Sequence, residues 1–373
     1  MEKVGIVGAS LAGLAAARAL RRQSFAGEII AIGAERHQPY DRPPLSKEFL
    51  TGAATIDDLV LPASSGDLGV TWRLGVAATR LDARNRSIHL DTGEEIRVDG
   101  VVIATGARAR QPSYPGVHTL RTVDDAIALR DALKAGGKVV VIGAGFIGAE
   151  VASSARSLGL DVTVVEALPT PLAGPLGPEM GGICARLHAD HGTRLLTGIP
   201  VSGVHDNQVE LADGTLLPAD VVVAGIGSLP NVAWLADSTI DMTNGVVIAP
   251  DGSTNLPHVV ATGDCAIQRG SIRSEHWTYA VEHPKIAAAT LLGTTAPAPR
   301  APYFWSDQYG VHLQFAGHRE AGDSVRIVEG DPEERSFLAV YERGGHPVAV
   351  LGMNQPRLFT QWRRRLTAVP QEA

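Results

Sequence analysis

Two short glycine-rich segments limit what this chain of 373 residues can fold into. The first is Gly8-Ala-Ser-Leu-Ala-Gly13, directly after the apolar run VGIV, and the second is Gly143-Ala-Gly145-Phe-Ile-Gly148, directly after KVVVI. Each opens a helix-like pattern. In such a strand–turn–helix unit the first glycine permits the tight turn, the middle one admits a phosphate group, and the last lets the helix pack on the strand. Ser10 takes the middle position of the first copy and is small enough to leave room.

An acidic residue follows each turn. Glu35 follows Gly13, and Glu166 follows Gly148, at the spacing of about 20 residues expected of a ribose-binding acid. Two complete units predict two dinucleotide sites, and therefore electron transfer between a nicotinamide and a flavin. A carboxylate accepts a hydrogen bond from a 2′-hydroxyl but repels a 2′-phosphate, so Glu166 favours NADH over NADPH at the second site.

Apolar runs that alternate with helical patterns indicate the fold class. Several of these runs are apolar throughout, which is typical of strands buried on both faces of a parallel sheet. The pattern predicts doubly wound α/β domains, followed after about residue 300 by a smaller α+β domain without a glycine-rich turn. The expected parallel strands are VGIV (4–7), EIIAI (28–32), VVIA (101–104), KVVVI (138–142), DVTVV (161–165), DVVVA (220–224) and HVVAT (258–262).

Composition excludes several classes. A net charge of −7 argues against broad nucleic-acid binding, which needs a basic face. The two cysteines, Cys184 and Cys265, cannot form a disulfide framework or ligate an iron–sulfur cluster, and they fit a reducing compartment. Arg18 interrupts the N-terminal stretch that could pass for a signal peptide, and no run approaches the roughly 18 apolar residues of a membrane span. We therefore expect a cytoplasmic protein without a metal site or a membrane partner.

Two further segments carry polar residues in unusual settings. Residues 38–50, QPYDRPPLSKEFL, hold three prolines and are expected to be neither regular helix nor sheet. Lys47 in this segment could alternatively begin an exposed helix capped by Ser46. Gly263-Asp264 follows the strand-like HVVAT, where an acid could accept hydrogen bonds from a flavin's ribityl chain, although such a dipeptide is also a common turn.

The chain resembles the FAD-dependent NADH:ferredoxin reductases that serve bacterial oxygenases and cytochromes P450, and the resemblance covers essentially its whole length. Rubredoxin reductases and apoptosis-inducing factor are more distant relatives. The resemblance implies a glutathione-reductase-type fold, with an FAD domain at 1–110 and 236–300, an NAD domain at 111–235 and an interface domain at 301–373. The motifs that carry it are the two glycine turns, PYDRPPLSK, ATG (104–106), VVVAGIGSLPN (221–231), ATGDCA and WSDQYGVHLQFAG (305–317).

The resemblance also implies residue roles. Lys47 would sit beside the flavin ring and pair with Glu150, and Trp277 would lie against the flavin where electrons leave. Arg42 would contact the FAD pyrophosphate or neighbouring backbone, and Asp264 the ribityl chain. The other implied cofactor-binding residues are Gly8, Ser10, Leu11, Ala12, Gly13, Glu35, Ala104, Thr105, Gly106, Gly143, Gly145, Phe146, Ile147, Gly148, Glu166, Gly227 and Gly263.

Simpler explanations exist for two of these residues, and the chain departs from the family in two places. Glu150 could be a first-turn acid favoured by a helix dipole, and Trp277 could be ordinary core. Family members often carry arginines soon after the ribose-binding acid, where this chain has LPTPLAGPLG. Tyr279 and His283 replace amide residues expected near the flavin.

The implied activity moves electrons from NADH through FAD to an external [2Fe–2S] ferredoxin, by a monomer or a weak homodimer. Because ferredoxins are usually acidic, Arg269, Arg273 and Arg363–Arg365 are candidate docking residues, each of which could equally be part of a solvated face. The alternatives are an NADH oxidase or rubredoxin reductase on the same fold, or an FAD-bearing interaction protein like apoptosis-inducing factor. A disulfide reductase would need a redox cysteine beside the flavin, and we expect Cys265 to be structural.

Overall fold

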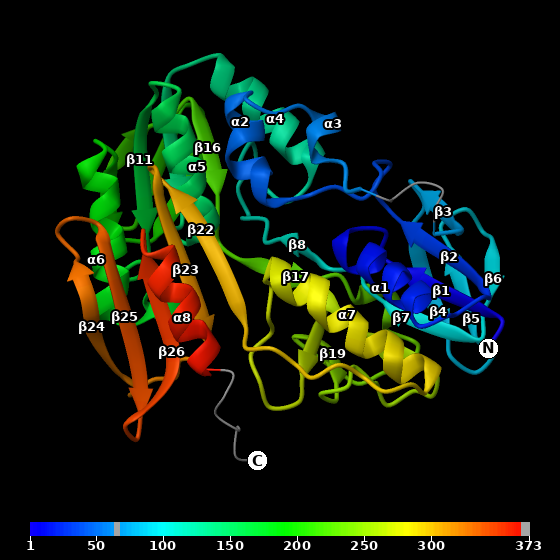
Figure 1. Ribbon diagram of the computed structural model, residues 1–373. Coiled ribbons are helices and arrows are strands. Elements are labelled where there is room, and N and C mark those ends of the chain that lie inside the picture. Colours follow the sequence, from blue (N-terminus) through cyan, green and yellow to red (C-terminus); the bar gives the residue numbers. More distant parts are fainter. Residues whose placement is uncertain (63–67, 367–373) are drawn as a thin grey trace. The chain divides into compact units, whose positions relative to one another are not determined.

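The computed structural model describes residues 1–62 and 68–366 (Figure 1). Contacts divide the chain into two compact units. The first unit comprises residues 1–41, 59–108 and 228–300, and the second comprises residues 42–58, 109–227 and the segment from residue 301. Each unit is thus assembled from segments far apart in the sequence. None of the described helices is long and apolar enough to cross a membrane.

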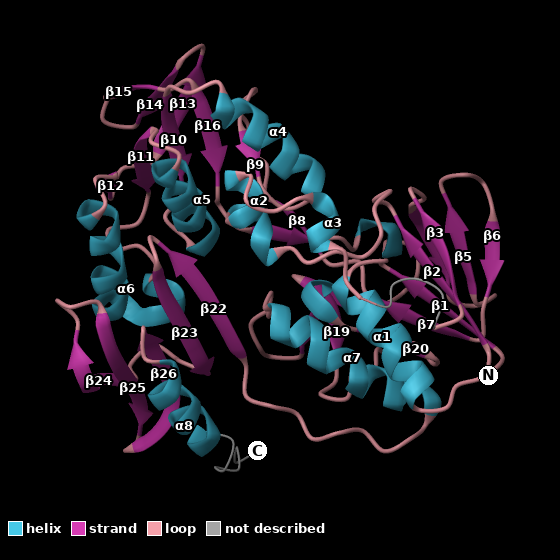
Figure 2. Cartoon of the chain, turned by 45° about the horizontal axis from the view of Figure 1, so that its top comes forward, coloured by secondary structure: helices cyan, strands magenta, loops and turns pink. Residues whose placement is uncertain are grey.

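A parallel sheet in the order β20–β7–β1–β2–β3 forms the centre of the first unit (Figure 2). Ile6 and Val102 face the helices α1 and α7, whereas Val7 and Ile103 pack against small antiparallel strands on the opposite face. Burial on both faces explains the continuous apolar runs. The elements are β1 (Lys3–Val7), α1 (Leu11–Arg22), β2 (Glu28–Gly33), β3 (Val70–Leu74), β4 (Ala78–Asp82), β5 (Ser87–Leu90), β6 (Glu95–Arg97), β7 (Gly100–Ile103), η2 (Ala233–Leu235), β18 (Met242–Thr243), β19 (Gly245–Ile248), β20 (Val259–Ala261), η3 (Gly263–Cys265), β21 (Ala266–Gln268) and α7 (Trp277–Leu292).

The second unit holds a similar parallel sheet in the order β12–β11–β10–β16–β9, against which α5 packs. Residues 139–141 of β10 and all of β16 are buried, because neighbouring strands flank both on each side. The elements are β9 (His118–Thr119), α4 (Val123–Lys134), β10 (Lys138–Ile142), α5 (Phe146–Ser157), β11 (Asp161–Glu166), α6 (Ala173–Asp190), β12 (Arg194–Thr197), β13 (Val201–His205), β14 (Gln208–Leu211), β15 (Leu216–Pro218) and β16 (Val221–Ala224). Where the chain passes between units lie β8 (Ala107–Ala109) and β17 (Ser228–Pro230).

The C-terminal part of the second unit is an antiparallel sheet in the order β22–β23–β26–β25–β24, with a helix on each face (Figure 1). Leu176 and Met180 of α6 pack on one face, and Phe359 of α8 packs on the other. The Tyr341 hydroxyl donates to Leu176 O at 2.7 Å, which ties the sheet to α6. The elements are β22 (Tyr303–Gln308), β23 (Val311–Gly317), β24 (Ser324–Asp331), β25 (Ser336–Arg343), β26 (His346–Met353) and α8 (Pro356–Leu366).

The proline-rich segment is more regular than its sequence predicts. Pro43–Ser46 form a 3-10 helix, η1, which is followed by the short helices α2 (Glu48–Thr51) and α3 (Ile56–Leu59). Prolines at the first positions of a helix give up N–H groups that no intrahelical carbonyl would accept, so they are tolerated there. The segment packs against α4 and α5, and the Arg42 guanidinium donates to Arg121 O at 2.6 Å.

Two parallel α/β sheets and an antiparallel C-terminal domain confirm the predicted fold class. The predicted strands agree with β1, β2, β7, β10, β11, β16 and β20 to within a residue or two. The boundaries predicted for the FAD, NAD and interface domains stay a prediction.

The last glycine of each turn leads to a test of the fold. A Cβ atom at Gly148 would lie 2.0 Å from the backbone Gly143 O, whereas one at Gly145 would lie 3.9 Å from Gly225 O, its nearest neighbour. Gly148→Ala is therefore expected to lower the free energy of unfolding by about 1–3 kcal/mol through overpacking, and Gly145→Ala to change it by less than about 0.5 kcal/mol. Urea unfolding followed by circular dichroism measures both, and equal urea midpoints would contradict the packing role of Gly148.

Candidate functional site

The first glycine turn lies at the carboxyl end of the parallel sheet of the first unit. Gly8 has φ +119°, and a Cβ atom there would lie 2.0 Å from Ala104 O. A Cβ atom at Gly13 would lie 1.8 Å from Gly8 O, so both positions require glycine. The helix α1, which follows, has no acidic residue in its first turn. Its N–H groups and dipole can therefore favour an anion such as a pyrophosphate.

Two other predicted segments reach the same sheet edge. A Cβ atom at Gly263 would lie 2.9 Å from the Ala12 side chain, so the turn that carries Asp264 packs against the start of α1. The ATG segment is fixed by a reciprocal pair, because Thr105 Oγ1 donates to Asn231 O at 2.7 Å and Asn231 Nδ2 donates to Thr105 O at 3.1 Å. Nucleotides bind at the carboxyl ends of parallel strands, and this set of residues fits FAD.

Glu35 and Trp277 also make specific polar contacts in this unit. The Tyr40 hydroxyl donates to Glu35 Oε2. The Trp277 indole N–H donates to Asp41 Oδ1 at 2.6 Å, and Trp277 is only partly buried at the start of α7. Trp277 thus lies partly buried with its indole N–H paired, and both its predicted place against the flavin and the alternative of an ordinary core tryptophan stay predictions.

The two departures in α7 form one packed group. The rings of Tyr279 and His283 stack with centroids 4.6 Å apart, and His283 Nδ1 shares a hydrogen bond with Thr262 Oγ1 at 2.9 Å. His283 is 3% exposed, and its Nε2 has no hydrogen-bond partner among the described residues. Burial lowers the pKa of His283 to about 4, so the ring is neutral near pH 7.

The second glycine turn repeats this geometry in the second unit. Gly143 has φ +96°, and a Cβ atom there would lie 2.5 Å from Gly225 O. Gly145 caps α5, which has no acidic residue in its first turn. Glu166, at the end of β11, accepts from Ala144 N at 2.8 Å and from Leu168 N at 2.9 Å. A helix N-terminus with a fixed carboxylate beside it fits the phosphates and ribose of a nicotinamide dinucleotide.

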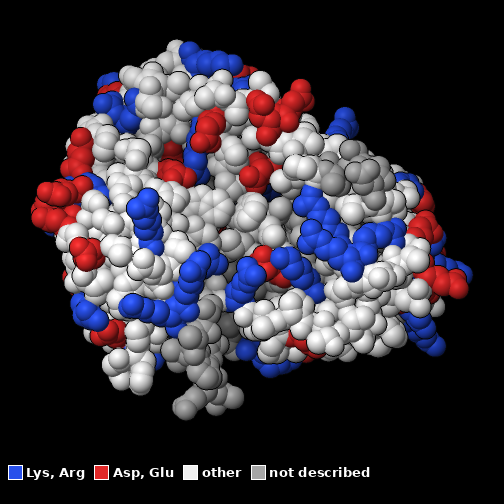
Figure 3. All heavy atoms as spheres, viewed as in Figure 1, with Lys and Arg blue, Asp and Glu red and all other residues white. Residues whose placement is uncertain are grey.

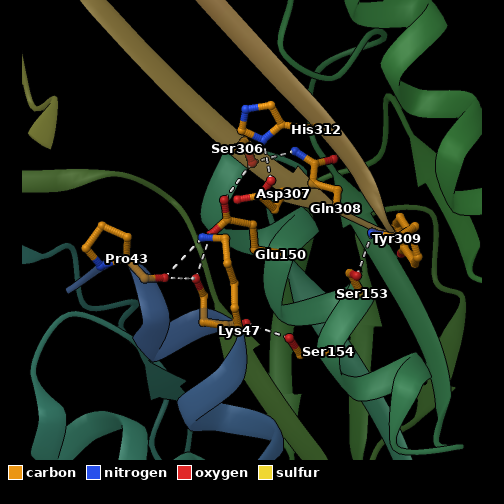
Figure 4. Close-up of polar contacts among 11 residues, drawn as sticks. Pro43, Lys47, Glu150, Ser153, Ser154, Ser306, Asp307, Gln308, Tyr309 and His312 are labelled. Atoms are coloured by element: carbon orange, nitrogen blue, oxygen red, sulfur yellow. Dashed lines mark hydrogen bonds and ion pairs between the residues drawn. The ribbon is translucent and has the colours of Figure 1, made fainter. Parts of the chain in front are cut away.

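A buried ion pair joins the proline-rich segment to α5 (Figure 4). Lys47 Nζ donates to Glu150 Oε2 at 2.7 Å and to Pro43 O at 3.1 Å. The two side chains are 14% and 4% exposed. Ser46 Oγ donates to the same carboxylate oxygen at 2.5 Å, and Ser306 Oγ donates to Oε1 at 2.6 Å.

These contacts correct two of the simpler explanations. Glu150 lies beyond the first turn of α5 and is 3% exposed, so a surface acid placed for the helix dipole is wrong. Lys47 is not an exposed helix residue, and the Ser46 side chain makes no cap because it donates to Glu150 instead. Sequence reasoning identified the ion pair but missed Ser46 and Ser306 as its partners. Their signal was that both lie inside motifs shared with the family, PPLSK and WSDQY.

The expected surface arginines differ in their burial. Arg273 donates to Asp264 O at 2.7 Å and pairs with Glu275 at 2.6 Å, with a side chain only 4% exposed. Its prediction as a docking residue is therefore wrong, because a partner protein cannot reach it. Arg269 is exposed and pairs with Asp241 at 3.2 Å. Arg363–Arg365 lie in the last turn of α8.

Both cysteines are buried, and neither forms a disulfide. Cys265 Sγ contacts Thr262 O at 3.3 Å and Ile103 O at 3.6 Å. Burial raises the pKa of this thiol, and a thiol that resists ionisation is a poor redox nucleophile. The expected structural role of Cys265 agrees with these contacts.

Comparison with known proteins shows the family to which this chain belongs. The family described as "Pyridine nucleotide-disulphide oxidoreductase" matches residues 2–283, and "Reductase C-terminal" matches residues 303–371. Rhodocoxin reductase of Rhodococcus erythropolis is 37% identical over 94% of this chain and 86% of its own length. The ferredoxin–NAD(+) reductase component of the p-cumate 2,3-dioxygenase system of Pseudomonas putida is 36% identical over 89% of this chain and 84% of its own length.

A solved structure matches as well. The crystal structure of the covalent putidaredoxin reductase–putidaredoxin complex superposes with a TM-score of 0.94 at 32% identity, over 98% of this chain and 93% of that one. Fold and site thus define a pyridine nucleotide-dependent oxidoreductase of the class that uses FAD and NAD(P)H. Within that class the chain belongs to the ferredoxin reductases, the family of putidaredoxin reductase and of the reductase components of dioxygenase systems.

The buried His283 leads to a prediction for stability at low pH. An unfolded histidine binds a proton near pH 6.5, whereas the pKa of His283 in the folded chain is lowered to about 4. Between these values the unfolded state binds more protons, so the free energy of unfolding falls as the pH drops from about 6.5 to 4. His283→Gln removes this contribution and is expected to flatten the dependence by up to about 1.4 kcal/mol per pH unit. Urea unfolding from pH 4.5 to 7.5 measures it, and parallel pH curves for the two proteins would refute it.

Proposed function

We propose that this chain is a cytoplasmic reductase that passes electrons from NADH, through FAD held by the first unit, to a [2Fe–2S] ferredoxin serving a cytochrome P450 or a ring-hydroxylating oxygenase. The observation that carries the proposal is the pair of glycine turns, one in each unit, whose first and last glycines lie where no larger residue fits. One dinucleotide alone would need one such turn, whereas electron transfer between two dinucleotides needs both.

The residues of the first unit bind and orient the flavin cofactor. When bound, FAD would take electrons from a nicotinamide as a pair and release them singly, which an iron–sulfur acceptor requires. The N-terminus of α1 would hold the pyrophosphate, because its N–H groups and dipole favour an anion and no acid in its first turn repels one. Asp264 would accept from the ribityl chain, and Arg273 fixes the backbone of Asp264 through its hydrogen bond to the carbonyl.

Glu166 selects NADH over NADPH. Its carboxylate is held by Ala144 N and Leu168 N, so it cannot easily turn away from the ribose. A fixed negative charge at that position accepts a 2′-hydroxyl and repels a 2′-phosphate. The residues that follow carry no arginine to attract a phosphate, and Leu168 is exposed.

The resemblance to the family assigns the Lys47–Glu150 pair to the flavin ring, where Lys47 would supply a cation. A cation beside the ring favours the reduced, anionic flavin, and a lysine that is 14% exposed needs the carboxylate as its partner. Glu150 also helps to orient the nicotinamide. The low exposure of the pair supports an electrostatic role, because the attraction within an ion pair on the surface is weakened by water.

The electron acceptor is another protein. Two buried cysteines cannot hold an iron–sulfur cluster in this chain, so the cluster belongs to the partner. The relatives named after a ferredoxin or a dioxygenase system support this class of partner. Lys and Arg side chains gather over α8 (Figure 3), and the Arg363 guanidinium lies 4.2 Å from the centre of the Tyr303 ring. We assign α8, with Arg363–Arg365, to the docking surface for an acidic ferredoxin.

Anaerobic reduction of the flavin tests the proposed function. NADH is expected to bleach the flavin absorbance within the dead time or milliseconds of mixing, and NADPH to act at least about tenfold more slowly, as expected when a carboxylate faces a 2′-phosphate. Cytochrome c reduction is expected to depend on an added [2Fe–2S] ferredoxin. Equal NADH consumption with oxygen alone would favour an oxidase, dependence on rubredoxin instead would favour a rubredoxin reductase, and a flavin that NADH does not reduce would favour an interaction protein.

Replacing Lys47 tests the ion pair. Lys47→Ala is expected to fold and to retain FAD, yet to slow flavin reduction by NADH at least about tenfold, equal to about 1.4 kcal/mol of barrier. The double variant Lys47→Ala, Glu150→Gln controls for the uncompensated carboxylate that the single change leaves buried. Stopped-flow absorbance measures the rate. Wild-type rates in Lys47→Ala would remove Lys47 from the reaction.

A further inference from the structure

The strand β22 presents alternate side chains to opposite sides. Ser306 and Gln308 are 0% and 1% exposed, as expected for residues two apart on one face of a strand. Asp307, between them, points to the other side and bonds His312 Nδ1 at 2.5 Å on the paired strand β23 (Figure 4). The buried face of WSDQY therefore offers a hydroxyl and an amide to whatever lies beneath it.

Glu150 lies beneath that face. Gln308 Nε2 donates to Ser306 Oγ at 3.0 Å, and Ser306 Oγ donates to Glu150 Oε1 at 2.6 Å. The amide occupies a lone pair of the serine oxygen, so the single hydroxyl proton is directed at the carboxylate. Each group in this series therefore donates to the next, from Gln308 through Ser306 in the C-terminal sheet to Glu150 in α5.

The other carboxylate oxygen is held from a different segment. Ser46 and Lys47, both in the proline-rich segment, donate to Glu150 Oε2 at 2.5 and 2.7 Å. The torsion that turns a carboxylate about its last bond is broad, so donors at Oε2 alone would leave the plane of the group poorly defined. A donor at Oε1 from a second direction fixes that plane.

We propose that Ser306 is a positioning residue of the reductase reaction. Through its hydroxyl, oriented by Gln308, it holds the Glu150 carboxylate in the plane in which that group pairs with Lys47 and orients the nicotinamide. This inference rests on the proposed function, because it assigns Ser306 a role in electron transfer from NADH to the flavin. Ser306 acts only through Glu150 and touches no reacting atom.

A matched pair of variants isolates the hydroxyl. Thr and Val have nearly the same shape and both suit a strand, so Ser306→Thr keeps the donor whereas Ser306→Val removes it at equal volume. The limiting rate of flavin reduction at saturating NADH is expected to be about tenfold lower in Ser306→Val than in Ser306→Thr, the effect of one hydrogen bond to a charged group. The dissociation constant for NAD+ is expected to be the same in both, which separates orientation from binding.

Two controls show whether Ser306 acts through Glu150. In a Glu150→Ala background the rates of Ser306→Thr and Ser306→Val are expected to be equal, because the acceptor is gone. Ser87 of β5 is also 0% exposed and lies in the other unit, so Ser87→Thr and Ser87→Val are expected to reduce the flavin equally fast. Urea midpoints of the Ser306 variants give a readout independent of activity. Ser306→Val is expected to unfold at lower urea than Ser306→Thr in both backgrounds, because Gln308 Nε2 loses its acceptor, and the difference is expected to be larger where Glu150 is present.

The outcomes distinguish failure of the positioning role of Ser306 from failure of the proposed reductase function. If NADH reduces the wild-type flavin but Ser306→Thr and Ser306→Val have equal limiting rates, the positioning role is wrong while the proposed function stands. A shift in urea midpoint with equal rates would likewise overturn it and leave a purely structural hydroxyl. If NADH does not reduce the wild-type flavin, the proposed function fails and the positioning role fails with it.

Discussion

The second unit depends on a carboxylate that is almost completely withdrawn from water. Glu150 is 3% exposed, and a charge in that setting is tolerated only when a cation and hydrogen-bond donors compensate it. The donors come from two segments that α5 could not recruit locally, the proline-rich segment with Lys47 and the strand β22 with Ser306. Breaking such a group by removing one partner costs about 3–5 kcal/mol. The ionised group therefore constrains three segments of the chain to meet at one point.

The same reasoning explains why a stiff segment suits this position. Lys47 belongs to a stretch in which Pro43 and Pro44 begin a 3-10 helix, and the Pro43 carbonyl itself accepts from the Lys47 ammonium at 3.1 Å. Proline reduces the number of conformations that the unfolded segment loses on folding. Holding the lysine in place thus costs less conformational entropy than it would in a flexible loop, and the ion pair retains more of its attraction.

Features fixed by local geometry could be predicted from the residues themselves, whereas of the contacts between distant segments only the Lys47–Glu150 pair was predicted, and it came from the resemblance to the family. The glycines were predictable because a Cβ atom at Gly13 or Gly148 would meet a carbonyl only five residues back. Arg273 was misjudged because Asp264 O, which accepts from its guanidinium, lies in a separate turn, and a basic residue gives no sign of such pairing in advance. Ser306 lies in a motif shared with the family. The alternation of side chains along a strand does not show which face of the strand is buried, nor that Glu150 packs against that face.

Tyr279 and His283, which replace amide residues of the family in α7, change the charge near this helix less than their residue types suggest. A histidine in place of an amide could introduce a charge, but the pKa of His283 is lowered to about 4 by burial, so the ring stays neutral near pH 7. Its Nδ1 shares a hydrogen bond with Thr262, which directly precedes the Gly263-Asp264 turn, and an amide at that position would offer the same neutral donor or acceptor. Tyr279 stacks on this ring, and burial raises the pKa of its hydroxyl, so it too remains neutral. The net charge of α7 is therefore the same as the family pattern would give. The two aromatic rings replace the hydrogen bonds of two amides by stacking, and they add no charge.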